Sequence, residues 1–127
     1  MNNKDLKVAV LGAGAMGCLF GGLLAEKGLN VTLIDVWKEH VEEINKNGLK
    51  MDGHGGDRFI KIPATSDPST IGKVDAVIIM CKATALEPAL KSIKNIIRDK
   101  TVFMSCQNGI GHEARLKSIV GTEKVIG

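Results

Sequence analysis

The sequence predicts an α/β fold with a doubly wound, mostly parallel sheet, and two observations predict it. Short apolar runs alternate with segments of helical periodicity along most of the chain. The first apolar run, residues 7–11, leads directly into a glycine-rich turn of the pattern G-x-G-x-x-G, and a helical pattern over residues 15–27 follows. A strand, a glycine-rich turn and a helix in this order are the usual opening of a doubly wound sheet.

The helix predicted over residues 15–27 has apolar residues at intervals of three and four, which form one apolar face. These residues are Met16, Leu19, Phe20, Leu23 and Leu24. Gly21 and Gly22 each weaken a helix by up to ~1 kcal/mol relative to alanine, so we expect them to permit close packing against the sheet or a neighbouring element. Gly28 stands where a C-terminal cap belongs.

A second strand and helix repeat this arrangement. Residues 30–34 form an apolar run that predicts a strand. A helix is expected over residues 38–46, with Val41 and Ile44 turned inward and Gly48 as its end.

The next segment interrupts the alternation. Residues 49–52 and 58–62 are short, partly alternating and separated by a glycine-rich stretch, so they predict a hairpin. His54 lies in that stretch, and we interpret it as a solvated turn residue rather than a catalytic one. Residues 63–69 contain two prolines and predict a loop or short turn.

The second half of the chain predicts three more strands and two more helices. The segment 75–81 begins with Asp75 and continues as an uninterrupted apolar run, which is typical of a strand that is buried on both faces. The segment 84–87 is a capping box that begins a helix, with Pro88 in its first turn. The other predicted elements are the continuation of this helix through Leu90, Ile93 and Ile97, a strand over 101–106, a helix over 112–120 and a last strand at 124–126.

Composition and charge exclude several classes of protein. The net charge of +3 is spread over segments of mixed sign, and with one tryptophan and three phenylalanines the chain is not expected to bind nucleic acid. No apolar run approaches the roughly 18 residues of a membrane span, and no signal peptide is visible, so we expect a cytoplasmic location without a membrane partner. Cys18, Cys81 and Cys106 lack metal-ligand spacing and are expected to be free thiols in a reducing compartment, with no metal site.

The glycine-rich turn and Asp35 together form the fingerprint of a dinucleotide-binding site. Gly12 permits the tight turn, Gly14 lets a pyrophosphate approach the backbone, and Gly17 lets the helix pack close to the strand. Asp35 lies 18 residues beyond Gly17, at the end of the second strand, where a carboxylate can bind a ribose. The residues expected at the cofactor are Gly12, Ala13, Gly14, Ala15, Met16, Gly17 and Asp35. The alternative is a glycine-rich turn in an unrelated α/β protein.

Two further segments are expected to meet this turn, because ligands of doubly wound sheets lie beyond the carboxyl ends of the strands. Lys82 directly follows the run 77–81, and Gln-Asn-Gly-Ile-Gly-His-Glu at 107–113 follows the next strand. With the turn 12–17, these segments resemble the N-terminal domain of the ketopantoate reductases (2-dehydropantoate 2-reductases) over nearly the whole chain. The resemblance implies one Rossmann domain over residues 1–127, a nicotinamide cofactor and a small 2-keto acid as substrate.

The resemblance also implies roles for Lys82 and Asn108. In that family the lysine that matches Lys82 contacts the cofactor near the active-site cleft, and the asparagine that matches Asn108 touches both cofactor and substrate. A cation and an amide at neighbouring strand ends are chemically suited to orient a nicotinamide and a keto acid. Taken singly, Lys82 would be interpreted as a surface lysine that begins a loop, and Asn108 with its following glycine as an Asn-Gly turn.

The chain departs from the family at the cofactor's ribose. The family is mainly NADPH-dependent and commonly has a basic residue near the end of the second strand, where this chain has Asp35. A carboxylate accepts hydrogen bonds from the ribose hydroxyls and repels a 2′-phosphate, so NAD(H) is favoured. NADP(H) stays the alternative, because Lys38 offsets some of that repulsion. The segment 35–41, followed by 108–113, also resembles the NAD-using D-2-hydroxy-acid (D-mandelate type) dehydrogenases. The expected substrate is therefore ketopantoate or another branched or bulky 2-keto acid.

A second departure is length. Members of the family have a helical C-terminal domain that supplies the lysine acting as general acid, and the 127 residues lack it. We therefore expect the cofactor-binding part of a two-domain enzyme, without a catalytic residue of its own. The alternative is that Lys82, which is chemically able to donate a proton, acts as the general acid. The uncovered domain face is expected to favour self-association or a homodimer. A regulatory NAD(H)-sensing module and a structural partner that has lost nucleotide binding are the other two classes left open.

Overall fold

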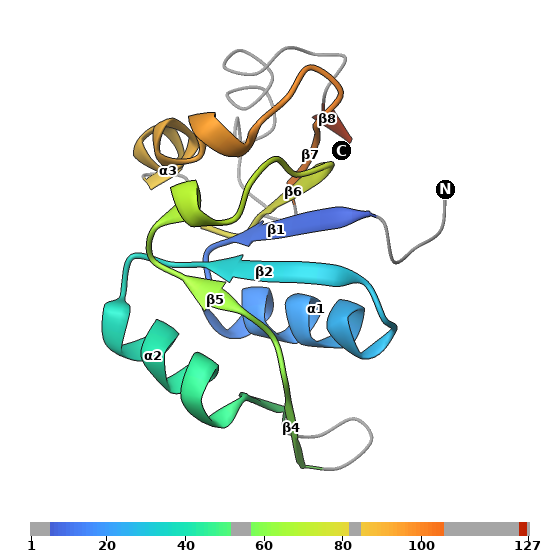
Figure 1. Ribbon diagram of the computed structural model, residues 1–127, viewed down its shortest axis with the longest axis vertical. Helices are drawn as coiled ribbons and strands as arrows, with labels where there is room; N and C mark the ends of the chain where they lie inside the picture. The colour runs from blue at the N-terminus through green and yellow to red at the C-terminus, as the bar shows by residue number, and fades with distance from the viewer. Residues whose placement is uncertain (1–5, 52–56, 82–84, 106–124, 127) are drawn as a thin grey trace.

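The computed structural model describes residues 6–51, 57–81, 85–105 and 125–126. Within this part, six parallel strands form one sheet in the order β5-β2-β1-β6-β7-β8 (Figure 1). The strands are β1 (Lys7–Leu11), β2 (Asn30–Ile34), β5 (Ala64–Thr65), β6 (Ala76–Ile79), β7 (Val102–Ser105) and β8 (Val125–Ile126). The predicted doubly wound α/β fold is confirmed.

The strand order reverses beside β1. From β1 the chain proceeds outward to β2 and β5, then returns to β6 on the other side of β1. Leu11 pairs with Ile34 on one side and with Ile79 on the other, so the carboxyl ends of three strands lie level with one another. This reversal is the topological switch point at which such sheets bind ligands.

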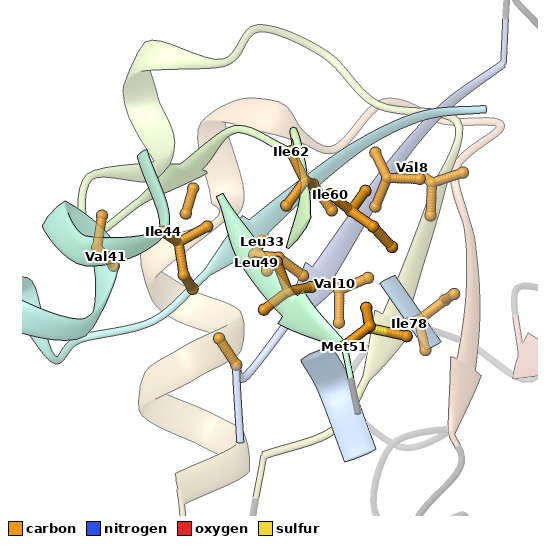
Figure 2. Packing of buried hydrophobic residues seen from close by; sticks show 13 residues of the cluster. Val8, Val10, Leu33, Val41, Ile44, Leu49, Met51, Ile60, Ile62 and Ile78 are labelled. Carbon is orange, nitrogen blue, oxygen red and sulfur yellow. The ribbon is translucent and has the colours of Figure 1, made fainter. Parts of the chain in front are cut away.

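The helices cover both faces of the sheet (Figure 1). Helices α1 (Ala15–Glu26) and α2 (Lys38–Asn47) lie on one face, and α3 (Leu86–Ser92) lies on the other. The residues of β1 alternate between the two cores, because successive side chains of a strand point to opposite faces. Val8 and Val10 belong to the cluster drawn in Figure 2, whereas Ala9 and Leu11 pack with the residues of α3.

Helix α1 packs only part of its predicted apolar face against the core: Leu19 and Leu24 pack there, whereas the other three residues are exposed. Met16, Phe20 and Leu23 are 55%, 38% and 37% exposed, while Gly21 and Gly22 are buried. A Cβ at Gly21 would lie 2.6 Å from Leu33 Cδ2, and one at Gly22 would lie 2.7 Å from Met51 Sδ. The helix therefore approaches the core most closely at these two glycines, and the expectation that they serve close packing is confirmed.

We expect Gly21→Val to lower the free energy of unfolding by about 1–3 kcal/mol, because it overpacks a site against the buried side chain of Leu33. Leu23→Val is the matched control, since it introduces the same β-branched side chain at an exposed position of the same helix. Urea unfolding of both variants measures the difference. Equal stabilities would contradict the close approach of α1 to the sheet.

Other predicted elements of the first half are confirmed almost to the residue. Helices α1 and α2 end where Gly28 and Gly48 have φ angles of +88° and +87°. Val41 and Ile44 are buried, as expected. The predicted hairpin is the antiparallel pair β3 (Leu49–Met51) and β4 (Arg58–Ile60), whereas His54 lies outside the described residues.

Part of the segment predicted as a loop is the short edge strand β5, followed by a 3₁₀ turn, η2 (Pro68–Thr70). Asn45 of α2 holds this strand with both ends of its amide. Its Oδ1 accepts from the Ala64 N–H at 2.9 Å, and its Nδ2 donates to the Ala64 carbonyl at 2.8 Å. A strand of only two residues, held by a side chain distant in sequence, is too short to show an alternating pattern. The sequence therefore predicts a loop at this position.

Helix α3 is shorter than predicted. It begins at Leu86 with Ala85 at its N-cap. Thr84, the first residue of the predicted capping box, lies outside the described residues, so the capping box stays a prediction. After Ser92 the chain continues as a 3₁₀ turn, η4 (Lys94–Ile96), which buries Ile96 completely in the α3-side core. The predicted strand at 101–106 is β7 and that at 124–126 is β8, whereas the helix predicted over 112–120 lies outside the described residues.

Candidate nucleotide-binding site

Gly12 forms the tight turn at the carboxyl end of β1. Its φ of +106° is a conformation that glycine adopts readily. Its N–H donates to the carbonyl of Ile34 in β2 at 2.8 Å, and a Cβ on it would lie 2.9 Å from the backbone nitrogen of Cys81, just past β6. The turn is thus enclosed by the ends of both neighbouring strands.

Gly17 and Gly14 are surrounded very differently. A Cβ on Gly17 would overlap the carbonyl oxygen of Gly12, so helix and turn approach each other as the fingerprint requires. A Cβ on Gly14 would have no described atom within 4 Å. Gly14 is the N-cap of α1, whose first turn contains no acidic residue. The open space at Gly14 therefore lies beside backbone N–H groups at the positive end of the helix dipole, which suits a phosphate.

Asp35 follows β2 and is hydrogen-bonded to the glycine-rich turn. Its Oδ2 accepts from the backbone N–H of Ala13 at 2.7 Å, and its Oδ1 accepts from the backbone N–H of Trp37 at 3.0 Å. These two bonds hold the half-buried carboxylate at the switch point. A carboxylate oxygen has two acceptor sites, so each oxygen retains the capacity for one more hydrogen bond.

Sequence reasoning missed two side chains that also bind Ala13. The carbonyl oxygen of Ala13 lies 2.8 Å from His40 Nε2 and accepts from the thiol of Cys18 at 3.2 Å. The ring of His40 stacks on that of Trp37, with centroids 5.4 Å apart. His40 lies in the mixed-charge segment 38–43, which looks like a solvated helix face, so only the tertiary structure reveals its contact.

The two described cysteines, Cys18 and Cys81, are free and half-buried, as predicted, while Cys106 lies outside the described residues. Burial, and after it the negative charge of Asp35, raise the pKa of the Cys18 thiol. Burial likewise raises the pKa of Cys81. A raised pKa keeps Cys18 protonated at neutral pH, so its S–H remains available as a donor to the Ala13 carbonyl.

The structure brings together the turn residues Gly12, Ala13, Gly14 and Gly17 with Asp35, as predicted. Met16 lies in the first turn of α1, 55% exposed, and the backbone of Ala15 begins that helix. Lys82 and Asn108 lie outside the described residues. Among the described side chains no cluster could hold a metal ion, and no described helix has the length and apolarity needed to cross a membrane.

Comparison with known proteins identifies the family. Residues 8–127 match the family described as ketopantoate reductase PanE/ApbA. The chain belongs to this family. The 2-dehydropantoate 2-reductase of Pyrococcus horikoshii is 42% identical over 116 residues, which are 91% of this chain and 37% of that protein. This ketopantoate reductase-family chain corresponds to the N-terminal domain of its relatives.

Solved structures of the family are similar as well. The PanE/ApbA family ketopantoate reductase of Ralstonia eutropha superposes with a TM-score of 0.84 at 35% identity, covering 91% of this chain and 39% of that one. A D-mandelate dehydrogenase in complex with NADH and anilino(oxo)acetate has a TM-score of 0.86 at 37% identity, covering 94% and 39%. The ketopantoate reductase-family chain thus spans about two fifths of the length of the relatives that it matches.

Proposed function

We propose that this chain is the cofactor-binding domain of a ketopantoate reductase-like oxidoreductase that prefers NADH. One observation carries the proposal: the Asp35 carboxylate is held 2.7 Å from the Ala13 N–H of the glycine-rich turn. A ribose-binding group and a phosphate-binding turn are thereby fixed side by side at the topological switch point. Family membership supports the same conclusion.

The described residues fit a dinucleotide. The space at Gly14 accepts a pyrophosphate near the backbone, and the first N–H groups of α1 supply its hydrogen-bond donors. The remaining acceptor sites of Asp35 bind the 2′- and 3′-hydroxyls of the adenine-side ribose. When bound, NADH supplies the hydride for the C2 carbonyl of a 2-keto acid. This domain contributes the binding and orientation that the transfer requires.

The substrate proposed for the complete enzyme is a small 2-keto acid. The named relatives support this class: they include 2-dehydropantoate 2-reductases and a D-mandelate dehydrogenase that was solved with anilino(oxo)acetate. We propose that Lys82 contacts the cofactor and that Asn108 contacts both cofactor and substrate, as the resemblance implies. An NAD-dependent D-2-hydroxy-acid dehydrogenase is the second candidate, favoured by Asp35 and by the similarity to the D-mandelate dehydrogenase.

We expect NADH to bind more tightly than NADPH by about 1–3 kcal/mol, because charge-assisted hydrogen bonds to the ribose diol are gained and repulsion of a 2′-phosphate is avoided. Asp35→Asn should narrow this difference, since it removes the charge and keeps one acceptor oxygen. Glu42→Ala, which removes an exposed carboxylate from α2, should leave the difference unchanged. Calorimetry with both cofactors measures this difference in binding free energy. Equal or tighter binding of NADPH by the wild type would contradict the preference for NADH.

A regulatory module that senses NAD(H) without catalysis is the alternative from a different class. Both hypotheses predict cofactor binding, so binding alone does not separate them. The separating measurement is turnover of a 2-keto acid when a second domain of the family is supplied with this one. Turnover supports the oxidoreductase, and binding without turnover in the complete protein supports the sensor.

A further inference from the structure

The peptide groups of Ala13 are hydrogen-bonded by side chains from three elements of the fold. The N–H donates to Asp35 after β2, and the carbonyl accepts from His40 of α2 and Cys18 of α1. Ala13 itself is 2% exposed. We propose that His40 is a positioning residue for cofactor binding, which acts by fixing the Ala13–Gly14 peptide plane. The inference rests on the proposed function and adds a residue outside the glycine fingerprint.

The planarity of the peptide bond connects His40 to the ligand space. The Ala13 carbonyl and the Gly14 N–H belong to one planar trans peptide, so they point in opposite directions. A hydrogen bond that fixes the carbonyl toward His40 therefore aims the Gly14 N–H away from it. Gly14 lies at the N-cap of α1, beside the open space where the pyrophosphate is proposed to bind. His40 thus orients an N–H donor without touching the cofactor's phosphates.

The histidine is well placed for this role because its own ring is held. Ala13's carbonyl oxygen is an acceptor only, so Nε2 carries the proton in this hydrogen bond. The ring stacks on Trp37 at an interplanar angle of 27°, and Cys18 Sγ lies 3.8 Å from Nε2. Glycine residues on either side of Ala13 make the turn intrinsically permissive. A turn already held in its binding conformation avoids the entropic cost of being ordered by the ligand.

Two substitutions of His40 separate the effect of its hydrogen bond to Ala13 from the effect of its stacking on Trp37. His40→Phe keeps an aromatic ring against Trp37 and loses the donor, whereas His40→Gln keeps an N–H donor and loses the ring. We expect His40→Phe to weaken NADH binding about three- to tenfold, the range of one hydrogen bond, and His40→Gln to restore most of that loss. Trp37 is the chain's one tryptophan, so energy transfer from its fluorescence to bound NADH measures the affinity directly.

A second ligand separates the proposed role of His40 from general destabilisation, which would weaken the binding of both ligands. Adenosine shares the base and ribose of NADH but has no phosphates, so its affinity, measured by competition, should be the same in both variants and the wild type. If His40→Phe binds NADH as tightly as the wild type, or if His40→Gln is no better than His40→Phe, the inference is overturned. Equal loss of NADH and adenosine binding would also overturn it. Absence of NADH binding by the wild type would refute the proposed function instead.

Discussion

Gly14→Val is expected to abolish NADH binding while the domain remains folded. A Cβ at Gly14 meets no described atom within 4 Å, so the folded chain has room for the larger side chain. The added methyl groups would occupy the space into which the pyrophosphate is proposed to bind, close to the first N–H groups of α1. Calorimetry should therefore detect no heat of NADH binding, with the urea midpoint close to that of the wild type.

Gly17→Val is the matched control, because it makes the same substitution three residues later with the opposite expected result. A Cβ at Gly17 would overlap the Gly12 carbonyl oxygen, a backbone atom that cannot move without distorting the turn. We expect this variant to be strongly destabilised. Unchanged NADH affinity in Gly14→Val would mean that the nucleotide binds elsewhere, and a stable Gly17→Val would contradict the close approach of α1 to the turn.

The 127-residue chain by itself is expected to bind NADH without reducing a 2-keto acid at a measurable rate. The resemblance places the general acid in a helical second domain, and the chain spans about two fifths of the length of its relatives. General acid assistance alone contributes about 10²–10⁴-fold to such a rate, and substrate contacts from the second domain would be missing as well. Keto-acid-dependent oxidation of NADH, followed by its absorbance, measures the activity of the purified chain.

Turnover by the isolated chain at rates normal for a dehydrogenase would contradict this expectation. It would make Lys82 the candidate for the general acid, and loss of that activity in Lys82→Ala would then identify it. The exposed apolar residues Met16, Phe20 and Leu23 of α1 are consistent with the expectation that the isolated chain self-associates. Light scattering across a concentration series measures that association.

Much of the fold could be predicted because its signals are local. The bounds of β1 and β2 match the predicted ranges, since each is a short, mostly apolar run that ends at a turn or a carboxylate. Gly48 ends α2 as expected because the backbone there requires a positive φ angle. The fingerprint likewise depends on spacing along one strand, turn, helix and second strand. Asp35 therefore lies at the turn, as its position in the sequence predicts.

The remaining features depend on contacts between segments that are distant in sequence. Periodicity identifies an apolar side of α1, but the helix buries Gly21 and Gly22, because close approach to Leu33 and Met51 excludes larger side chains. The two-residue strand β5 depends on its pairing with β2 and on the amide of Asn45, which binds the backbone of Ala64.

The candidate site likewise combines features that local sequence signals predict with contacts that form only in the folded chain. The sequence by itself determined the doubly wound fold and the glycine-rich turn, because their signals are local. It also placed Asp35 beside the turn, 22 residues from Ala13, because the fingerprint spans a complete strand, turn, helix and second strand. The tertiary structure alone decided that His40 and Cys18 bind the Ala13 carbonyl, 27 and 5 residues from it in sequence. The His40 contact exists only once α2 has packed on the same face of the sheet as α1, and no local pattern encodes that packing. The Cys18 contact lies within the turn and α1, and only the folded turn shows that the thiol reaches the Ala13 carbonyl.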